Sequence, residues 1–278
     1  MRLSALVHCR TFSFDFNPEF LAKPSDFTSD DINWAREHIL PATAYCDELE
    51  GKRYVLFSNS RYCVFGIVSL LDNALSMFGF SEESIKRYSF DENKRKIKCF
   101  IGFVFHVSDK SIGYIPMVND GDYNKLIESY VANDQVFFSN SQPCIQVDYT
   151  LEREIGQFII KEKPNEYCIS SNKNDEDMFA KLMSNVSSIN MVNFCSNVYN
   201  LKMLEDGKFD FFTSNQNTIQ RYNIKRAENN QKIREVIEQE KSEEIKTKEE
   251  GKKKDVLKVV FVASAAILLA VIILIILL

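Results

Sequence analysis

Apolar and polar positions alternate along several short segments of residues 1–214, which we call the head. Residues 12–16 carry phenylalanine at every second position, and residues 97–107 are largely apolar on both faces of an extended strand. Residues 175–187 instead repeat apolar side chains at helical spacing. Because both periods occur in one region, the head is predicted to have an α+β fold, with a mixed or antiparallel sheet and several helices.

The same patterns predict the order of elements in the head. Strands are expected at residues 3–7, 11–16, 53–58, 85–90, 97–107, 135–138, 144–149, 156–161, 167–170, 198–204 and 208–213. Helices are expected from a cap at Thr28 or Ser29 to Pro41, from Asp120 or Asp122 to Tyr130, and over residues 175–187; the stretch 62–78 should run from a strand into a helix. Turn residues at 91–94 and 205–207 predict hairpins between the flanking strands. The length permits one domain or two subdomains, of about residues 1–110 and 111–214.

The last twenty residues, 259–278, contain no charged side chain and a single polar one, Ser264. A helix of this length spans roughly 30 Å, about the thickness of the hydrocarbon core of a bilayer. We therefore predict a tail anchor, a single C-terminal transmembrane helix over residues 256–278 that binds the protein to a lipid bilayer. The residues expected within the membrane include Val259, Phe261, Ile267, Leu268, Ile272 and Leu278.

The flank of this apolar segment predicts its orientation. Lys252, Lys253, Lys254 and Lys258 lie directly before it. Clustered lysine marks the cytosolic side of a spanning helix, so these residues should determine the topology and place the N-terminal head in the cytosol. The N-terminal apolar stretch is too short for a signal peptide. Insertion is expected after translation, because the apolar segment 259–278 emerges last from the ribosome.

Residues 215–255 are predicted to form a charged helical stalk between the head and the anchor. Apolar residues such as Ile219 and Ile245 are too sparse for sustained heptads, so a solvated spacer helix is favoured over a weak coiled coil. A weak homodimer through the stalk or the tail is a further expectation. Of the 34 basic and 39 acidic residues in the chain, twelve and nine lie in residues 215–258, which leaves the head with a net charge of −8. An acidic head with dispersed basic residues disfavours a nucleic-acid partner.

The cysteines and histidines are few and scattered. None of the seven cysteines forms a C-x-x-C pair, and in a reducing cytosol they are expected to be free core thiols. A Cys–His hydrolase would need one of the three histidines beside a thiolate. Cys63 and His106, which could face each other across a sheet, are the weak catalytic candidates, although a core histidine is the simpler interpretation.

Motifs for phosphate, cofactor or metal binding are missing from the sequence. Neither a P-loop nor a G-x-G-x-x-G run occurs. Residues 119–124 resemble a calcium loop but lack its glycine and glutamate register, so we expect Asp122 to cap a helix instead. The acidic run 175–177 is interpreted as the first turn of another helix. No cofactor and no metal are therefore expected.

Three functions remain open on this basis. The preferred expectation is a tail-anchored, single-pass protein whose cytosolic head is an adaptor, receptor or scaffold for protein partners at a membrane surface. The alternative is a membrane-tethered enzyme of the Cys/His hydrolase type, with a site assembled from non-contiguous residues. A trafficking protein of the SNARE type has the same order of parts, but Gln231 and Arg234 lack the flanking apolar layers of such a coil.

Overall fold

The computed structural model describes residues 2–10, 20–49, 51–132, 147–148, 152–156, 166–186 and 191–239. The chain divides into two compact units, Met1–Gln220 and Arg221–Leu278. The strands of the first unit are β1 (Arg2–Cys9), β2 (Lys52–Ser58), β3 (Tyr62–Leu70), β4 (Lys98–His106), β5 (Tyr114–Pro116), β6 (Val147–Asp148), β7 (Glu152–Glu154), β8 (Glu166–Ile169), β9 (Val192–Cys195) and β10 (Phe211–Ser214). Its helices are α1 (Ser29–Thr43), α2 (Leu71–Met77), α3 (Glu82–Tyr88), α4 (Asp120–Leu126), α5 (Asn172–Asn185) and α6 (Leu201–Gly207).

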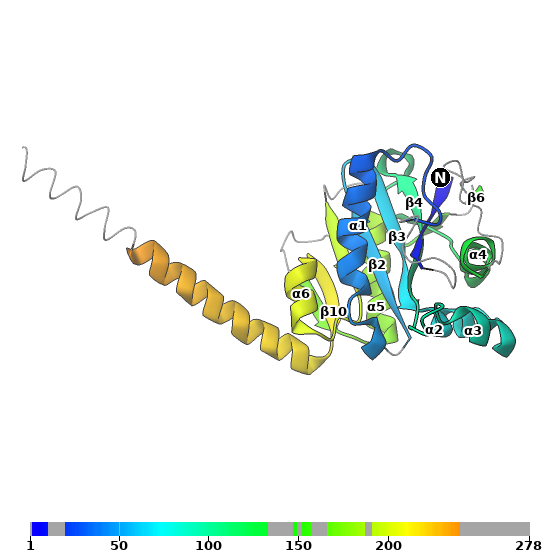
Figure 1. The fold of residues 1–278 in the computed structure, drawn as a ribbon. Helices are drawn as coiled ribbons and strands as arrows, with labels where there is room; N and C mark the ends of the chain where they lie inside the picture. The colour runs from blue at the N-terminus through cyan, green and yellow to red at the C-terminus, as the bar shows by residue number, and fades with distance from the viewer. Residues whose placement is uncertain are drawn as a thin grey trace, which may run out of the picture. The chain divides into compact units, whose positions relative to one another are not determined.

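Eight of the described strands form one mixed sheet (Figure 1) in the order β6-β1-β4-β3-β2-β9-β10-β8. Strand β10 runs parallel to both of its neighbours, and the other pairs are antiparallel. A separate two-stranded ribbon joins β5 to β7. The prediction of an α+β head is therefore confirmed. The predicted strands at 11–16 and 135–138, and most of 156–161, lie outside the described residues.

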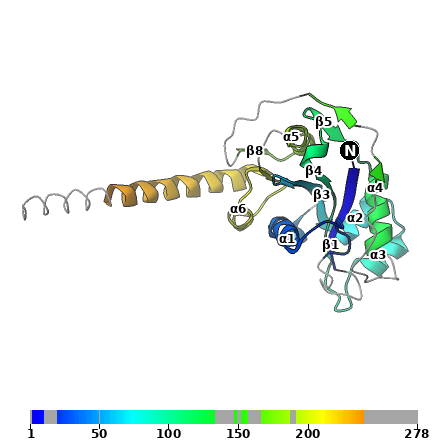
Figure 2. The same ribbon diagram turned by 90° about the horizontal axis from the view of Figure 1, so that it is seen from above.

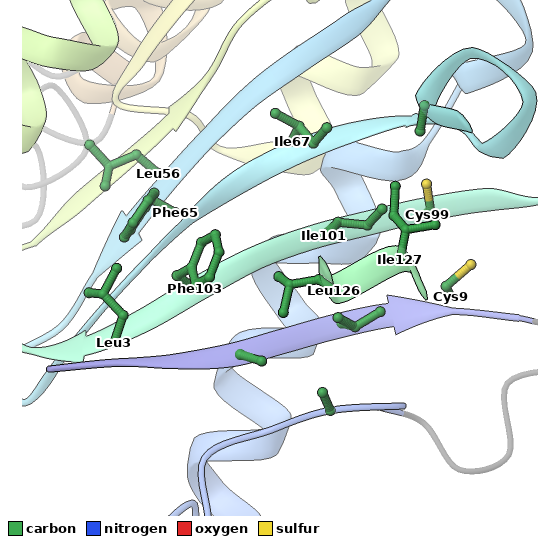
Figure 3. Packing of buried hydrophobic residues seen from close by; sticks show 14 of the residues in the cluster. Leu3, Cys9, Leu56, Phe65, Ile67, Cys99, Ile101, Phe103, Leu126 and Ile127 are labelled. Carbon is green, nitrogen blue, oxygen red and sulfur yellow. The ribbon is translucent and has the colours of Figure 1, made fainter. Parts of the chain in front are cut away.

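Helices cover both faces of the sheet (Figure 2), with α1 and α5 on opposite sides. The two central strands β3 and β4 are buried along almost their whole length, which agrees with the two-sided strand predicted at 97–107. Figure 3 shows the core on the face that α4 covers, where Phe65, Ile101 and Phe103 from the sheet pack with Leu126 and Ile127. Burying apolar side chains on both faces of one sheet is what holds this fold together.

Helix α1 begins as the sequence predicts and ends later. Thr28 is the N-cap: its hydroxyl oxygen accepts the Asp31 backbone N–H, and the Asp31 carboxylate accepts the Thr28 N–H. This capping box satisfies two N–H groups that otherwise lack partners. Pro41 was expected to end the helix, but the helix continues to Thr43. The proline lies in the last turn, where only one backbone hydrogen bond is lost.

The first predicted hairpin is wrong in one arm, because residues 82–88 form the helix α3. Ser81 caps this helix, with Glu82 and Glu83 in its first turn and basic residues in its last. Acidic residues at the N-terminus and basic residues at the C-terminus of a helix interact favourably with its dipole. In this segment that stabilisation outweighs the apolar spacing that is typical of a strand. The expected turn at 91–94 does exist: the Asp91 carboxylate accepts the backbone N–H groups of Asn93 and Arg95, but the turn joins a helix to β4.

The second predicted hairpin is also wrong. Residues 201–207 form α6, which Asn200 caps through a hydrogen bond from the Lys202 N–H. The helix connects β9, which the sequence pattern did not reveal, to the parallel strand β10. Adjacent parallel strands need a crossover instead of a tight turn, so a helix replaces the expected strand and turn.

The remaining predicted helices of the head also form: α4 begins at Asp120, one of its two predicted starts, and α5 begins three residues earlier than predicted. Asn119, and not Asp122, is the N-cap of α4, while Asp122 closes the capping box from inside the helix. One π-helical turn, Ile127–Val131, extends α4. Helix α5 begins at Asn172 after the cap Ser171, so that of the acidic run 175–177 only Asp175 lies in the first turn.

In the stalk region, residues 216–239 are helical. The Asn215 side chain accepts the Thr218 N–H at the beginning of this helix. None of the described helices combines the length and the apolar composition needed to cross a bilayer. The predicted anchor, residues 256–278, lies outside the described residues, and both the anchor and the stalk as a whole stay predictions.

Candidate functional site

Three side chains from distant parts of the sequence meet at one end of the sheet. The Asp26 Oδ2 atom accepts a hydrogen bond from the Tyr62 hydroxyl, at 2.9 Å, and lies 3.0 Å from His106 Nε2. The rings of Tyr62 and His106 also pack together, with centroids 4.7 Å apart. We call Asp26, Tyr62 and His106 the Asp26 cluster.

The sheet register brings this cluster together. Tyr62 begins β3 and His106 ends β4, and the two residues are paired across the antiparallel strands. The Asn59 side chain holds the turn before β3, because its oxygen accepts the backbone N–H groups of Arg61 and Tyr62. Asp26 lies just before the cap of α1, in a loop that follows the bridge between Ala22 and β1. The cluster therefore depends on the assembled fold.

Arg61 supports the tyrosine of the cluster. Its guanidinium lies 4.9 Å from the Tyr62 ring centroid, donates to the Tyr62 hydroxyl at 3.1 Å and is 3.5 Å from the Asp31 carboxylate. Burial, together with the hydrogen bond to Asp26 and its negative charge, raises the pKa of Tyr62 to about 12. Tyr62 thus remains protonated at neutral pH and donates its hydrogen to Asp26.

A cavity of about 320 Å³ opens beside the cluster. This volume is near the lower end of the range of roughly 300–1,000 Å³ that small-molecule sites occupy. The lining residues come from β1, the loop before α1, β3, β4 and the turn after β4: Arg2, Ser4, Pro24, Ser25, Asp26, Tyr62, Val104, Phe105, His106 and Asp109. The cavity combines charged and aromatic side chains, and the hydrogen bonds from Tyr62 and His106 hold the Asp26 carboxylate in place.

The structure does not bring the two catalytic candidates together. His106 is paired with Tyr62 and lines the cavity, with its side chain 45% exposed, whereas Cys63 is paired with Phe105. Successive residues of a strand point to opposite faces, so the Cys63 thiol and the His106 imidazole lie on opposite sides of the sheet. Burial also raises the pKa of the Cys63 thiol, which disfavours the thiolate that a nucleophile requires.

The described cysteines are all free thiols, as predicted. Cys9, Cys46, Cys63, Cys99 and Cys195 are buried and Cys168 is half-buried. Burial raises the pKa of Cys46 to about 11 and that of Cys195 to about 12. These thiols pack as small apolar side chains.

A second polar cluster lies where the three parallel strands end. Ser170 follows β8, Asn197 follows β9, and Thr213 is near the end of β10; all three hydrogen-bond to the buried carboxyl of Asp175. Tyr199 donates to the Asn197 side-chain oxygen at 2.8 Å. Burial raises the pKa of Asp175, and these hydrogen bonds oppose only part of the rise. The partners saturate the carboxyl from within the protein, which marks this cluster as structural.

Sequence reasoning reached only part of the Asp26 cluster. It singled out His106 but neither Asp26 nor Tyr62. Asp26 and His106 are 80 residues apart, and no motif connects them. The topology-determining lysines 252, 253, 254 and 258 and the anchor residues from Val259 to Leu278 lie outside the described residues. Within the described residues, no three His, Cys, Asp or Glu side chains are grouped to hold a metal.

Comparisons with protein-family models, with curated proteins and with solved structures find no match to this chain.

Proposed function

We propose that this protein is a tail-anchored, single-pass membrane protein whose head recruits protein partners to the cytosolic surface of a membrane. The observation that carries the proposal is the uncharged segment 259–278 on the same chain as a folded, acidic α+β unit. A helical stalk between the two would hold the head away from the lipid.

The energetics of insertion support the anchor. Leucine, isoleucine, valine and phenylalanine each contribute roughly −0.3 to −0.6 kcal/mol near the centre of a spanning helix. With such residues at most positions of 259–278 and no charge to oppose them, insertion is clearly favourable. Lys252, Lys253, Lys254 and Lys258 would then remain on the cytosolic side.

The character of the head supports recruitment of partners. Its net charge of −8 gives it a negative potential that steers basic partners toward it. The cavity beside the Asp26 cluster supplies a concave surface with positioned polar groups, which is the usual form of a recognition site.

Deletion of residues 256–278 tests the anchor. A fluorescent fusion of the full chain should label membranes, and the same fusion without these residues should become diffuse. A matched control would replace Ile267 and Leu268 by alanine, which keeps the segment apolar and should preserve membrane labelling. A truncated fusion that stays on membranes would overturn the assignment of the anchor.

Proximity labelling from the head tests recruitment. A labelling enzyme fused before residue 1 should enrich a defined set of cytosolic proteins in the native cell. If the head binds its partners at the membrane surface, the fusion without residues 256–278 should lose that enrichment. Equal labelling of bulk cytosol by both fusions would contradict the adaptor function.

A further inference from the structure

Asp26 has one carboxylate oxygen available for an incoming group. Its Oδ2 atom takes hydrogen bonds from Tyr62 Oη and His106 Nε2, at 2.9 and 3.0 Å. Since a carboxylate oxygen offers two lone pairs, Oδ2 has its full set of partners. Among the described residues no hydrogen bond reaches Oδ1, and the side chain is 49% exposed. Oδ1 is therefore the acceptor that remains for a ligand in the cavity.

The charges around the cavity favour a cation. Asp26 and Asp109 contribute two carboxylates to its wall, against the single guanidinium of the exposed Arg2. Ser108 donates to Asp109 Oδ1 at 3.4 Å, which is a long hydrogen bond, so this carboxylate too is largely available. The net negative charge of the whole head adds to the local field.

The hydrogen bonds on Asp26 favour an ammonium over a guanidinium. A guanidinium binds best in a fork to both oxygens of one carboxylate, and Oδ2 is already occupied. An ammonium is a compact charge with three donors, so one N–H can bind Oδ1 while another binds a second acceptor such as Asp109. The aromatic side chains of Tyr62 and Phe105 in the cavity wall suit the apolar stem of a lysine.

We propose that this cavity binds the primary ammonium of a lysine side chain on a partner protein. The inference rests on the proposed function, because it names the chemistry by which the head recognises what it recruits. In the bound state the ammonium lies on Asp26 Oδ1, and Tyr62 and His106 hold the carboxylate in the orientation that presents this oxygen.

The three histidines of the chain provide a site-specific measurement. The full chain, labelled with ¹³C at the histidine Cε1 and reconstituted in nanodiscs, is titrated with Nα-acetyl-lysine methylamide. The His106 resonance should move in a saturable way, while those of His8 and His38 should stay in place. The Nε-acetylated probe, which lacks the charge, should move none of them, and the arginine analogue should bind more weakly than lysine.

Variants of the carboxylates complete the test. Asp26→Asn should weaken binding of the lysine probe about tenfold or more, the usual effect of losing one charge-assisted hydrogen bond. Asp109→Asn, at an exposed position where folding is safe, should weaken binding by a smaller factor. The matched control Asp47→Asn removes an exposed carboxylate that pairs with Lys98 elsewhere, and it should bind as the wild type does.

Each opposite result overturns the inference. It fails if the acetylated probe shifts His106 as the charged probe does, if the arginine analogue binds as tightly as lysine, or if Asp26→Asn keeps wild-type affinity. Proximity labelling with Asp26→Asn separates this failure from that of the proposed function. Unchanged enrichment of partners would refute the role of the cavity and leave the adaptor function standing.

Discussion

At the scale of single residues, the buried carboxyl of Asp175 makes stability depend on pH. Burial raises its pKa above the ordinary value of 3.8, so the folded state holds the proton to higher pH than the unfolded state does. The stabilisation is therefore complete below the unfolded pKa and is lost as pH rises through the folded pKa. Asp175→Asn lacks this loss, so its free energy of unfolding should rise relative to the wild type as the pH rises above the ordinary pKa of 3.8 and through the higher folded pKa.

Urea unfolding of both proteins across this range, in a form truncated after residue 255, measures the effect. Asp177→Asn on the same helix is the matched control, because that side chain is exposed and should leave the wild-type profile unchanged. Parallel curves for wild type and Asp175→Asn would show that the carboxyl does not titrate differently in the folded state.

Arg53 is a second residue whose environment dictates a strong response. It is 1% exposed, and its guanidinium donates to the carbonyls of Ala42, Ala44 and Asn197 at 3.0, 2.7 and 3.1 Å. Two of these carbonyls are at the C-terminus of α1, where no backbone partner exists. Arg53→Met should reduce the free energy of unfolding by about 3 kcal/mol or more, since it leaves buried acceptors without donors.

The comparison for this change is Arg61→Lys, at a side chain 54% exposed, for which a loss below about 1 kcal/mol is expected. Thermal and urea unfolding of both variants give the two values. An Arg53→Met protein as stable as Arg61→Lys would show that water replaces the guanidinium without penalty.

At the scale of elements, the sequence pattern correctly predicted those strands and helices whose structure is determined by residues within the element itself. Strands β1 to β4 and helices α1, α4 and α5 follow from their local periodicity and caps. It failed at residues 85–90 and 198–204, where a turn and apolar spacing suggested hairpins but capped helices formed. The sequence pattern did not predict the Asp26 cluster for a related reason. The register of β3 and β4 pairs Tyr62 with His106, and the loop before α1 brings Asp26, 80 residues from His106, to both; no local pattern encodes either.

The pairing of β3 with β4 depends on two glycines. Gly66 and Gly102 are directly opposite each other, and a Cβ at Gly66 would lie 2.4 Å from the Ile101 carbonyl oxygen. At Gly102 it would lie 2.3 Å from the Phe65 oxygen. Backbone atoms cannot move aside as a flexible side chain can, so Gly66→Ala and Gly102→Ala should each destabilise the head by about 2 kcal/mol or more.

Gly121→Ala, in the first turn of α4, meets only the Asn119 side-chain oxygen at 3.0 Å and should change stability by less than about 1 kcal/mol. Unfolding by urea compares the three variants. The same proteins carry a functional readout, because His106 is on β4: separation of β3 from β4 should also shift its NMR resonance. If Gly66→Ala or Gly102→Ala changes neither the free energy of unfolding nor the His106 resonance, then β3 and β4 can move apart without loss of stability.

At the scale of the whole molecule, the proposed topology makes the lysine flank decisive. Lys252, Lys253, Lys254 and Lys258 are expected to keep the head on the cytosolic side and to interact with anionic lipid at about 1 kcal/mol each. Changing all four to glutamate should leave insertion of residues 259–278 intact, because the apolar segment is unaltered. It should weaken the preference for one orientation and remove the salt-sensitive attraction of the flank to anionic vesicles.

Protease protection in isolated membranes measures the orientation. With epitope tags added before residue 1 and after residue 278, the wild type should lose only the N-terminal tag to external protease. The four-glutamate variant should retain a protected fraction of the N-terminal tag, whereas replacing the four lysines by arginine, which keeps the charge, should reproduce the wild type. If the glutamate variant is digested like the wild type, charge does not set the topology, and the bulk of the folded head, which resists translocation, is then the determinant.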